Sequence, residues 1–516
     1  MSGPRWALAV CLVASIGCRA GPEDAVWILP ADPGPLAIED ELSPLPGALA
    51  LPRASSAAVT SLWTAGAGPL SLGQVLRAVD ASFPLLTVAR QKRILVEAKQ
   101  LKALGAFDLE LGAKAQWNLE GFYENHTAGV TLEQATGAWG LRVLGGYRVG
   151  NGNFDLTFDG KRRINHGGEF SLGFALPVLQ GGSFDASRRD LDSAGFERKL
   201  ADSELAMLRL RYSAEAAYAY WDWVAAGGRQ TIAESLLALA EVRQRGLEEA
   251  LTRGAIAEIE VLDNRRLVVE RSALVVKARR GIEKAALKLA LFLRDAQGKP
   301  ILPGSAALIP ELPPGSTPLG AALEVDLEQA LARRPDLLRL LQLREQERVG
   351  LRFAENELLP QLDLTVLASQ DLDRRRPSVT KGEFELMAGL QFKFPLQNRK
   401  ARGLVLESET RLSQLGETLR LARDKVALEV RDAFSELRAA HEREVQVREA
   451  ASLARRVAEA ERERFSLGDS TILKLNLREA YAAEAELKLV DALRDYWSAA
   501  ARYAVSVGAA PVGPGL

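Results

Sequence analysis

Strict alternation of apolar and polar residues marks four short segments of the chain. It runs through DLELGAKAQWNLEGFY from residue 108, FSLGFALPV from residue 170, QLDLTVLAS from residue 361 and FELMAGLQFKF from residue 384. Side chains alternate between the two faces of a strand, so the pattern predicts strands with one apolar and one polar face. About ten such residues is the length that a strand needs to cross a bilayer. Strands are expected at about 107–124, 168–178, 360–371 and 383–395.

The second pattern is helical and very long. From residue 404 to 465 no proline occurs, and apolar or small residues recur at spacings of four and three, as in a coiled-coil seam. A helix of about sixty residues spans on the order of 90 Å, which is too long for one globular domain. Long helices are expected at about 185–252, 256–294, 400–466 and 470–507. The expected seam of the last helix is Ile472, Leu475, Ala482, Leu489, Leu493, Ala500, Tyr503 and Val507.

These elements occur twice in the same order. LSLGQVLRAVDASFPLL from residue 70 resembles VDLEQALARRPDLL from residue 325, and RGAIAEIEVLDNRR from residue 253 resembles LGDSTILKLNLREA from residue 467. The chain is therefore predicted to be a duplicated helix-strand-strand-helix-helix unit. The first copy is expected at 70–299, a linker at 300–318, the second copy at 319–508 and a tail at 509–516.

The strand region of the first copy is longer than that of the second. From Pro84 to Pro177 the interval is 177 − 84 = 93 positions, whereas from Pro335 to Pro395 it is 395 − 335 = 60, a difference of 33 residues. We expect these residues around Tyr123 to Gly167, as an enlarged loop or an added hairpin between two strands. WGLRVLGGYRV from residue 139 and NFDLTF from residue 153 alternate weakly, and glycines 145, 146, 150 and 152 would supply a turn.

The N-terminus reads as a secretory signal peptide, with Arg5, an apolar run from Trp6 to Ile16, and small residues before Cys18. SIGC at 15–18 resembles a bacterial lipobox, although Ser15 replaces the usual leucine. This predicts a signal peptide at 1–17 and lipidation of Cys18, with an ordinary signal peptide as the alternative. A Pro/Ala-rich linker is expected at 18–69.

Charge and composition exclude several classes of protein. The 66 basic and 67 acidic residues nearly cancel and are interleaved, so the basic patch of a nucleic-acid-binding protein is missing. Four strands cannot close a barrel, and an open edge in lipid leaves backbone groups unpaired, so membrane strands would require several copies of the chain. The alternative is a soluble, half-buried hairpin packed on helices.

In both copies, from about residue 70 to 508, the sequence resembles the TolC-like outer membrane efflux protein family. The resemblance implies a mainly helical fold with a sheet, in which three chains build one twelve-stranded outer-membrane barrel, four strands per chain, continued by a periplasmic helical barrel. It implies a homotrimer in outer membrane lipid that meets a periplasmic adaptor (membrane fusion) protein and an inner-membrane transporter. Exported solutes would pass through passively, with no reaction and no cofactor.

The resemblance also implies site residues at the helical turns. Glu260 and Lys474 match the aspartate of the family's turn motif. In the second copy of family members, this aspartate and another three residues later form an acidic ring at the aperture. Here those two positions are Lys474 and Leu477, so the resemblance implies that the ring is missing. We hypothesise that Lys474 pairs with Glu260 to hold the tip shut, the alternative being a lysine that faces solvent. The expected periplasmic tip and adaptor contact is Arg253, Gly254, Leu467, Gly468, Asp469 and Ser470, and the expected aperture is Glu260, Asp263, Lys474 and Leu477.

The sequence gives little support to two other classes of protein, an enzyme and a soluble coiled-coil scaffold. An enzyme is disfavoured because the three histidines, His126, His166 and His441, lie far apart without metal-ligand spacing. GGYRVGNG at 145–152 lacks the lysine and the helix of a phosphate loop. Catalytic and metal-binding residues are therefore not expected. A soluble coiled-coil scaffold would explain the helices but neither the alternating strands nor the signal peptide.

Overall fold

The computed structural model describes residues 69–122, 124–152, 167–295, 298–303, 309–318, 322–372, 384–511 and 513, all of which belong to one unit of the chain. The predicted signal peptide, Cys18 and the N-terminal linker to residue 68 lie outside the described residues. His166 and the NFDLTF segment also lie outside them.

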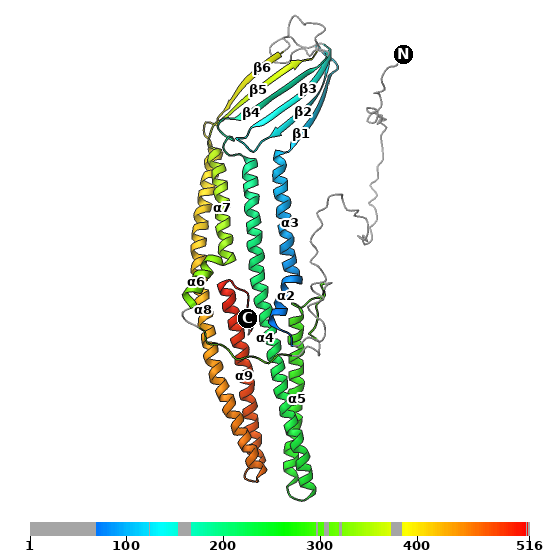
Figure 1. Ribbon diagram of the computed structural model, residues 1–516, viewed down its shortest axis with the longest axis vertical. Helices are drawn as coiled ribbons and strands as arrows, with labels where there is room; N and C mark the ends of the chain where they lie inside the picture. Colours follow the sequence, from blue (N-terminus) through cyan, green and yellow to red (C-terminus); the bar gives the residue numbers. More distant parts are fainter. Residues whose placement is uncertain are drawn as a thin grey trace, which may run out of the picture. The chain divides into compact units, whose positions relative to one another are not determined.

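Both copies contain helices, then strands, then two long helices (Figure 1). The first copy holds α2 (Leu72–Ser82), α3 (Pro84–Leu104), the 3-10 turn η1 (Gly105–Phe107), β1 (Leu109–Asn118), β2 (Asn125–Ala135), β3 (Arg142–Gly152), β4 (Glu169–Pro177), α4 (Ala186–Thr252) and α5 (Glu258–Ala290). The second holds α6 (Ala322–Arg333), α7 (Pro335–Asn356), β5 (Gln361–Asp371), β6 (Phe384–Lys393), α8 (Arg399–Ser466) and α9 (Ile472–Val507). The predicted mainly helical fold with a sheet is confirmed.

The sheet differs from the prediction in its strand number. The described residues form one antiparallel sheet of six strands in the order β1-β2-β3-β4-β5-β6, so the prediction of four strands per chain is wrong. The two additional strands, β2 and β3, form an added hairpin within the 33 extra residues of the first copy, which was one of the two expected outcomes. Glycines 145, 146, 150 and 152 lie inside β3 and do not make the turn, which is formed by residues 136–141.

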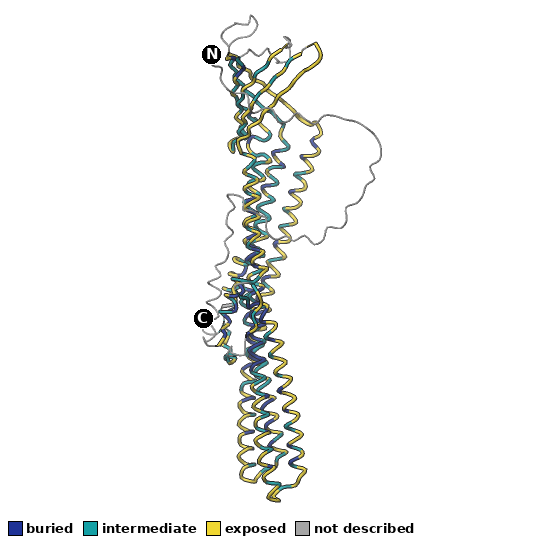
Figure 2. The backbone as a smooth tube through the Cα atoms, turned by 90° about the vertical axis from the view of Figure 1, so that its right-hand side faces the viewer, coloured by how far each residue is buried: buried dark blue, intermediate teal, exposed yellow. Residues whose placement is uncertain are grey.

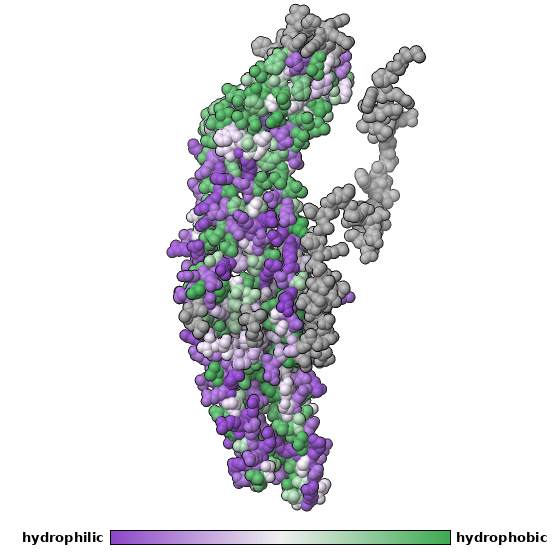
Figure 3. Space-filling model, viewed as in Figure 1, coloured by the Kyte–Doolittle hydropathy of each residue, from purple (hydrophilic) through white to green (hydrophobic). Residues whose placement is uncertain are grey.

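One face of the sheet is apolar across all six strands. The register places Leu111 of β1 beside Leu132 of β2, which pairs in turn with Gly145 of β3. Gly145 pairs with Leu172 of β4, and the row continues through Ala368 and Leu386. The neighbouring row on the opposite face is mostly polar: Gly112, Thr131, Gly146, Ser171, Ser369 and Glu385. Figure 3 shows hydrophobic residues gathered over the sheet, whereas the helices carry many hydrophilic ones.

The helices form two rows beyond the sheet. Next to the sheet, α3 contacts α4, α4 contacts α7 and α7 contacts α8. Farther away α5 and α9 replace α3 and α7, so that α4 lies against both α5 and α9, and α9 lies against α8 (Figure 1). The 67 residues of α4 and 68 of α8 pass through both rows, and each helix is about 100 Å long. None of the helices in the described ranges combines the length and apolar composition needed to cross a bilayer.

The core lies midway along the helices, where Figure 2 shows most of the buried residues. Trp221 of α4 is 2% exposed and stacks on Trp497 of α9, with ring centroids 5.0 Å apart. Tyr220 donates a hydrogen bond to the Leu70 carbonyl, and burial raises the pKa of Tyr220 to about 12. Gly227 does not interrupt α4; a Cβ there would come within 2.8 Å of the Ile309 side chain, so glycine admits the inter-copy segment.

Candidate functional site

The two long helical hairpins end in turns with the same backbone, both at the end opposite the sheet (Figure 1). Arg253 and Leu467 end their helices with nearly equal dihedral angles, and the glycines that follow, Gly254 and Gly468, have φ of 73° and 80°. The next amide bonds back to the helix in both cases, from Ala255 N to Ala250 O and from Asp469 N to Arg464 O, each at 2.9 Å. This bond and the left-handed glycine define a Schellman motif in each copy.

The side chains of the second turn are polar and paired. Asp469 accepts a hydrogen bond from Arg464 Nε at 3.1 Å, and Ser470 donates its hydroxyl to the buried carboxylate of Glu461. The Thr471 hydroxyl caps α9 by accepting from the Lys474 amide at 3.4 Å. Leu467 itself is 78% exposed. The second turn is therefore fixed by its own side chains and leaves one large apolar residue in solvent.

The first turn lacks these contacts. Ala257 precedes α5 without a side-chain cap, and Arg253 reaches Glu249 one helical turn back at 3.4 Å. Ala255 and Ile256 occupy the positions of Asp469 and Ser470. The six residues predicted at the tip thus lie in or beside the two turns, while their role as an adaptor contact stays a prediction.

The residues predicted at the aperture lie in the first two turns of α5 and α9. Asp263 accepts from Arg266 Nη2 at 3.0 Å, Glu260 is half-buried, and Lys474 and Leu477 are exposed. Within its own chain, Lys474 Nζ has no ion pair among the described residues. The Lys474–Glu260 pair is not formed inside one chain, and its formation between copies stays a prediction.

A buried charged cluster joins all four helices of the lower row. The Glu479 carboxylate of α9, with its side chain 1% exposed, accepts from Arg243 Nη2 of α4 at 2.7 Å. Arg462 Nη2 of α8 and Arg271 Nη2 of α5 lie 3.3 and 3.5 Å from the same carboxylate. Three guanidinium groups from three helices therefore converge on one carboxylate.

The cluster is held by further polar contacts. Arg271 also donates to the Leu236 carbonyl at 2.8 Å, and Arg243 donates to the Asn476 side chain. Burial lowers the pKa of Arg271, the Glu479 charge raises it in part, and the nearby Arg243 charge lowers it. The sequence analysis missed this cluster, although Glu479 falls between Leu475 and Ala482 in the α9 seam, where an apolar residue is expected.

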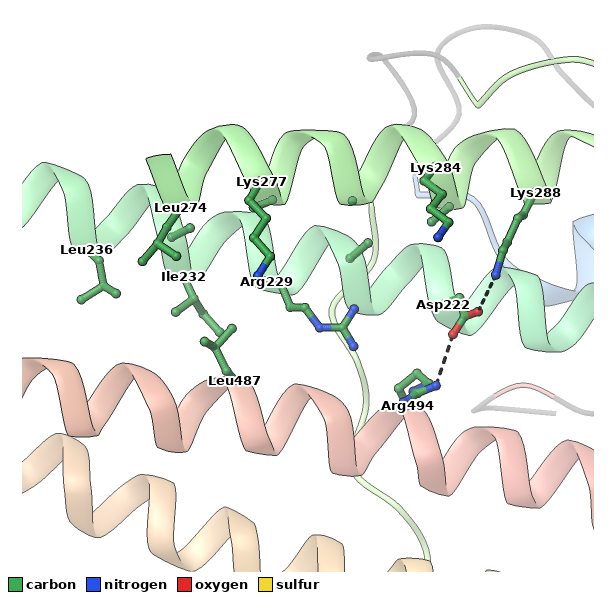
Figure 4. Close-up of a pocket in the computed structure, with 15 residues that line it drawn as sticks. Asp222, Arg229, Ile232, Leu236, Leu274, Lys277, Lys284, Lys288, Leu487 and Arg494 are labelled. Carbon is green, nitrogen blue, oxygen red and sulfur yellow. Dashed lines mark hydrogen bonds and ion pairs between the residues drawn. The ribbon is translucent and has the colours of Figure 1, made fainter. Parts of the chain in front are cut away.

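A basic pocket of about 530 Å³ lies between α4, α5 and α9 (Figure 4). Asp222 pairs with Lys288 at 3.8 Å and with Arg494 at 3.5 Å. Lys277 and Lys284 also line the pocket, together with Arg229, over apolar side chains. The pocket therefore carries an excess of positive charge in a chain whose net charge is −1.

The apolar face of the sheet is exposed on β1, β2, β3, β4 and β6 and half-buried on β5. Leu111 is 72% exposed and Leu390 is likewise 72% exposed, values that a packed core residue does not have. Exposed apolar patches of this extent mark interaction with a membrane or a partner. No group of three or more His, Cys, Asp and Glu side chains in the described ranges is arranged to hold a metal ion.

The sequence was compared with models of protein families and with curated proteins. Residues 327–509, most of the second copy, match the sequence model of the outer membrane efflux protein family. A search of curated proteins finds no match to the chain. The expected resemblance to this family is confirmed.

Solved structures of outer membrane channels share the fold. The open state of the MtrE outer membrane channel of Neisseria gonorrhoeae is 14% identical, with a TM-score of 0.59 over 85% of this chain and 89% of that one. The CmeC outer membrane channel of Campylobacter jejuni is 14% identical, with a TM-score of 0.56 over 85% of each chain. The outer membrane protein VceC of Vibrio cholerae is 16% identical, with a TM-score of 0.56 over 86% of this chain and 97% of that one.

Proposed function

We propose that this chain is the outer-membrane channel component of a tripartite efflux or secretion system and conducts exported solutes passively. The observation that carries the proposal is the sheet whose one face is apolar across six strands, exposed on β1, β2, β3, β4 and β6 and half-buried on β5, joined to helices about 100 Å long. A wall with lipid on one side and water on the other needs such a sheet. The polar helices below it suit a water-filled periplasmic duct.

The unpaired edges of the sheet support a homotrimer. Strands β1 and β6 each pair on one side only within the described sheet. In lipid, every unpaired backbone group costs several kcal/mol, so the edges of neighbouring copies must join and the sheet must close. The outer helices α5 and α8 also expose apolar side chains that neighbouring copies would cover, among them Val269, Val276, Leu421 and Leu428.

The proposed channel catalyses no reaction and needs no cofactor. Solutes diffuse along the polar inner face, and the energy comes from an inner-membrane transporter through a periplasmic adaptor protein. The adaptor would meet the two turns at the tip, where one turn offers the exposed, apolar Leu467 beside the charged Asp469 and the other turn offers the charged Arg253. Asp469 pairs with Arg464 at 3.1 Å and Arg253 with Glu249 at 3.4 Å, both in solvent.

Cys18 is the proposed site of a lipid anchor on the inner leaflet of the outer membrane. The motif SIGC behind an apolar run supports it. Replacing Cys18 with Ala is expected to abolish acyl labelling while leaving part of the transport, because the sheet itself inserts. An acyl-labelled band that survives the substitution would refute the anchor and leave the channel untouched.

Fractionation tests the proposed function against its alternative, a periplasmic or soluble coiled-coil scaffold. A channel is expected in the outer membrane, released only by detergent, as a trimer that separates into single chains on heating. A scaffold would appear in the soluble fraction as an elongated oligomer without detergent. Recovery in that fraction would overturn the proposal.

A further inference from the structure

Among the residues that the structure describes, the β2–β3 hairpin has no counterpart in the second copy. We infer that it is part of the membrane wall, so that the trimer closes with six strands from each chain, eighteen in all, and the wall of strands is as wide as the helical row beneath it. This inference rests on the proposed trimeric channel. Its alternative is a hairpin that lies beside the wall as a decoration.

The register of the sheet fits two inserted wall strands. Leu109 of β1 pairs with Gln134, which pairs with Val143, which pairs with Phe174 of β4. Without the hairpin, Leu109 would face Phe174 directly. A slip by one residue would exchange the two faces of every later strand. The hairpin therefore adds two strands and preserves the apolar face.

The hairpin has the same two faces as its neighbours. Val130, Leu132 and Tyr147 lie on the apolar face and are 45%, 44% and 41% exposed. On the opposite face, Arg142 pairs with Glu133 at 2.9 Å, and Arg148 pairs with Glu169 of β4 at 2.6 Å. Charged pairs on one face and exposed apolar side chains on the other are what a wall between water and lipid requires.

The turn of the hairpin is anchored where β4 leads into α4. Gly140 has φ of 63°, and a Cβ there would come within 2.7 Å of Pro177 and of the Gly181 carbonyl. Arg188 of α4 donates to the Gly181 and Gly182 carbonyls at 2.8 and 2.9 Å and is 15% exposed. The turn therefore lies against a rigid junction, which keeps the hairpin in line with the sheet.

The width of the six-stranded sheet also agrees with the width of the row of helices next to it. Four helices in the row α3-α4-α7-α8, spaced about 8–10 Å apart, occupy about 32–40 Å of circumference. Strands about 4.8 Å apart and tilted by about 35–45° occupy about 6–7 Å each. Six strands then span about 35–41 Å and four only about 23–27 Å. The wall of six strands per chain therefore matches the helical row, whereas four strands per chain would make a narrower wall.

Single cysteines test the inference in full-length trimers reconstituted into liposomes. Thr131→Cys and Val130→Cys probe the two faces of β2, and Lys114→Cys and Ala113→Cys probe the two faces of β1 as a reference. The unsubstituted protein gives the background from any free thiol of the native Cys11 and Cys18. We expect a water-soluble maleimide to label Thr131→Cys and Lys114→Cys at least tenfold faster than their neighbours, because a thiol that faces lipid stays protonated and out of the reagent's reach.

The labelling results distinguish failure of this inference from failure of the proposed channel. If the β1 pair alternates while both β2 cysteines react with the water-soluble reagent, the hairpin is outside the wall and this inference is wrong, although the channel stands. If the β1 pair does not alternate, the proposed channel wall is itself wrong and the inference falls with it. Electron microscopy of the detergent-solubilised trimer gives a second reading: eighteen strands support the inference, and twelve overturn it.

Discussion

The two helical hairpins, α4 with α5 and α8 with α9, turn with the same backbone and carry different side chains. Positions in the two turns differ by 468 − 254 = 214, and the same glycine conformation and the same return hydrogen bond occur in both. A left-handed glycine is sufficient to reverse each helix. The side chains around it are therefore free to diverge.

The side chains at the second turn are polar at positions where those at the first turn are apolar. The second copy fixes its turn with Ser470 and Glu461, whereas the corresponding positions of the first copy, 470 − 214 = 256 and 461 − 214 = 247, are Ile256 and Leu247. A polar contact in one copy thus corresponds to apolar residues in the other. In the proposed trimer a partner at the tip meets two chemically distinct turns, three of each kind. The duplicated unit gives both turns the same backbone, and their different side chains allow a partner to bind one turn in preference to the other.

The largest expected effect is at Glu479, where the two hairpins meet. Replacing Glu479 with Leu leaves Arg243 and Arg271 buried without their carboxylate, and removing one partner of a buried pair costs about 3–5 kcal/mol. A marked fall of the thermal unfolding midpoint in detergent is expected. The matched control is Glu484→Ala on the same helix, because its pair with Lys488 is 59% exposed on the Glu484 side and contributes little. Equal midpoints for the two variants would contradict the role of the cluster.

The turn glycines test whether the two turns are energetically alike. Gly254→Ala and Gly468→Ala place a Cβ in open space but force alanine into the left-handed region, at a cost of about 1–2 kcal/mol each. Gly246→Ala and Gly416→Ala, within α4 and α8, are the controls and should each stabilise the helix by about 0.5–1 kcal/mol. Urea unfolding measures both pairs. A cost at one turn glycine and none at the other would show that the turns are not equivalent.

The caps offer a reciprocal exchange between the copies. Thr471→Ala removes the side-chain acceptor of the Lys474 amide and should cost about 1 kcal/mol. Ala257→Thr introduces the same group at an uncapped position and should gain a similar amount. The same unfolding measurements apply, and a loss in both variants would mean that the first turn cannot adopt the capped geometry of the second.

The smallest change in stability is expected at Lys474. It lies in the first turn of α9, where the helix dipole favours negative charge, as Glu258 and Glu260 provide for α5. Lys474→Asp should therefore stabilise the helix by about 0.3–1 kcal/mol. If Lys474 lies at the aperture, the same variant should create block by divalent cations from the periplasmic side, and Lys474→Glu should raise the resting conductance by repelling Glu260. Unchanged conductance and divalent sensitivity in both variants would place Lys474 outside the aperture.

Long periodic elements could be read from the sequence because their signal is local. The sequence predicts a helix over about 400–466, and α8 extends over Arg399–Ser466; it predicts a strand over about 360–371, and β5 extends over Gln361–Asp371. Both depend on side-chain period alone. The hairpin was harder to assign, because Gly145, Gly146 and Gly150 resemble a turn although they belong to a strand. Gly146 is needed there, since a Cβ would lie 3.1 Å from Ser171 Oγ and 3.3 Å from the Val130 carbonyl.

The charged cluster could not be predicted in detail, because two of its three arginines are far from Glu479 in sequence. Arg243 and Arg271 precede it by 236 and 208 positions, and nothing local distinguishes them from the many solvated arginines of the long helices. The position of Glu479 in an apolar seam was the available signal. A charge at such a position requires a buried partner.

Single-channel recording is the most direct test of the central claim, that copies of this chain form a passive conduit. The purified full-length protein, inserted into a planar bilayer without partner or nucleotide, is predicted to give discrete current steps that grow in proportion to voltage. Protein that is demonstrably inserted and trimeric, yet passes no current at any voltage even with the Lys474→Glu substitution at the tip, would contradict the account.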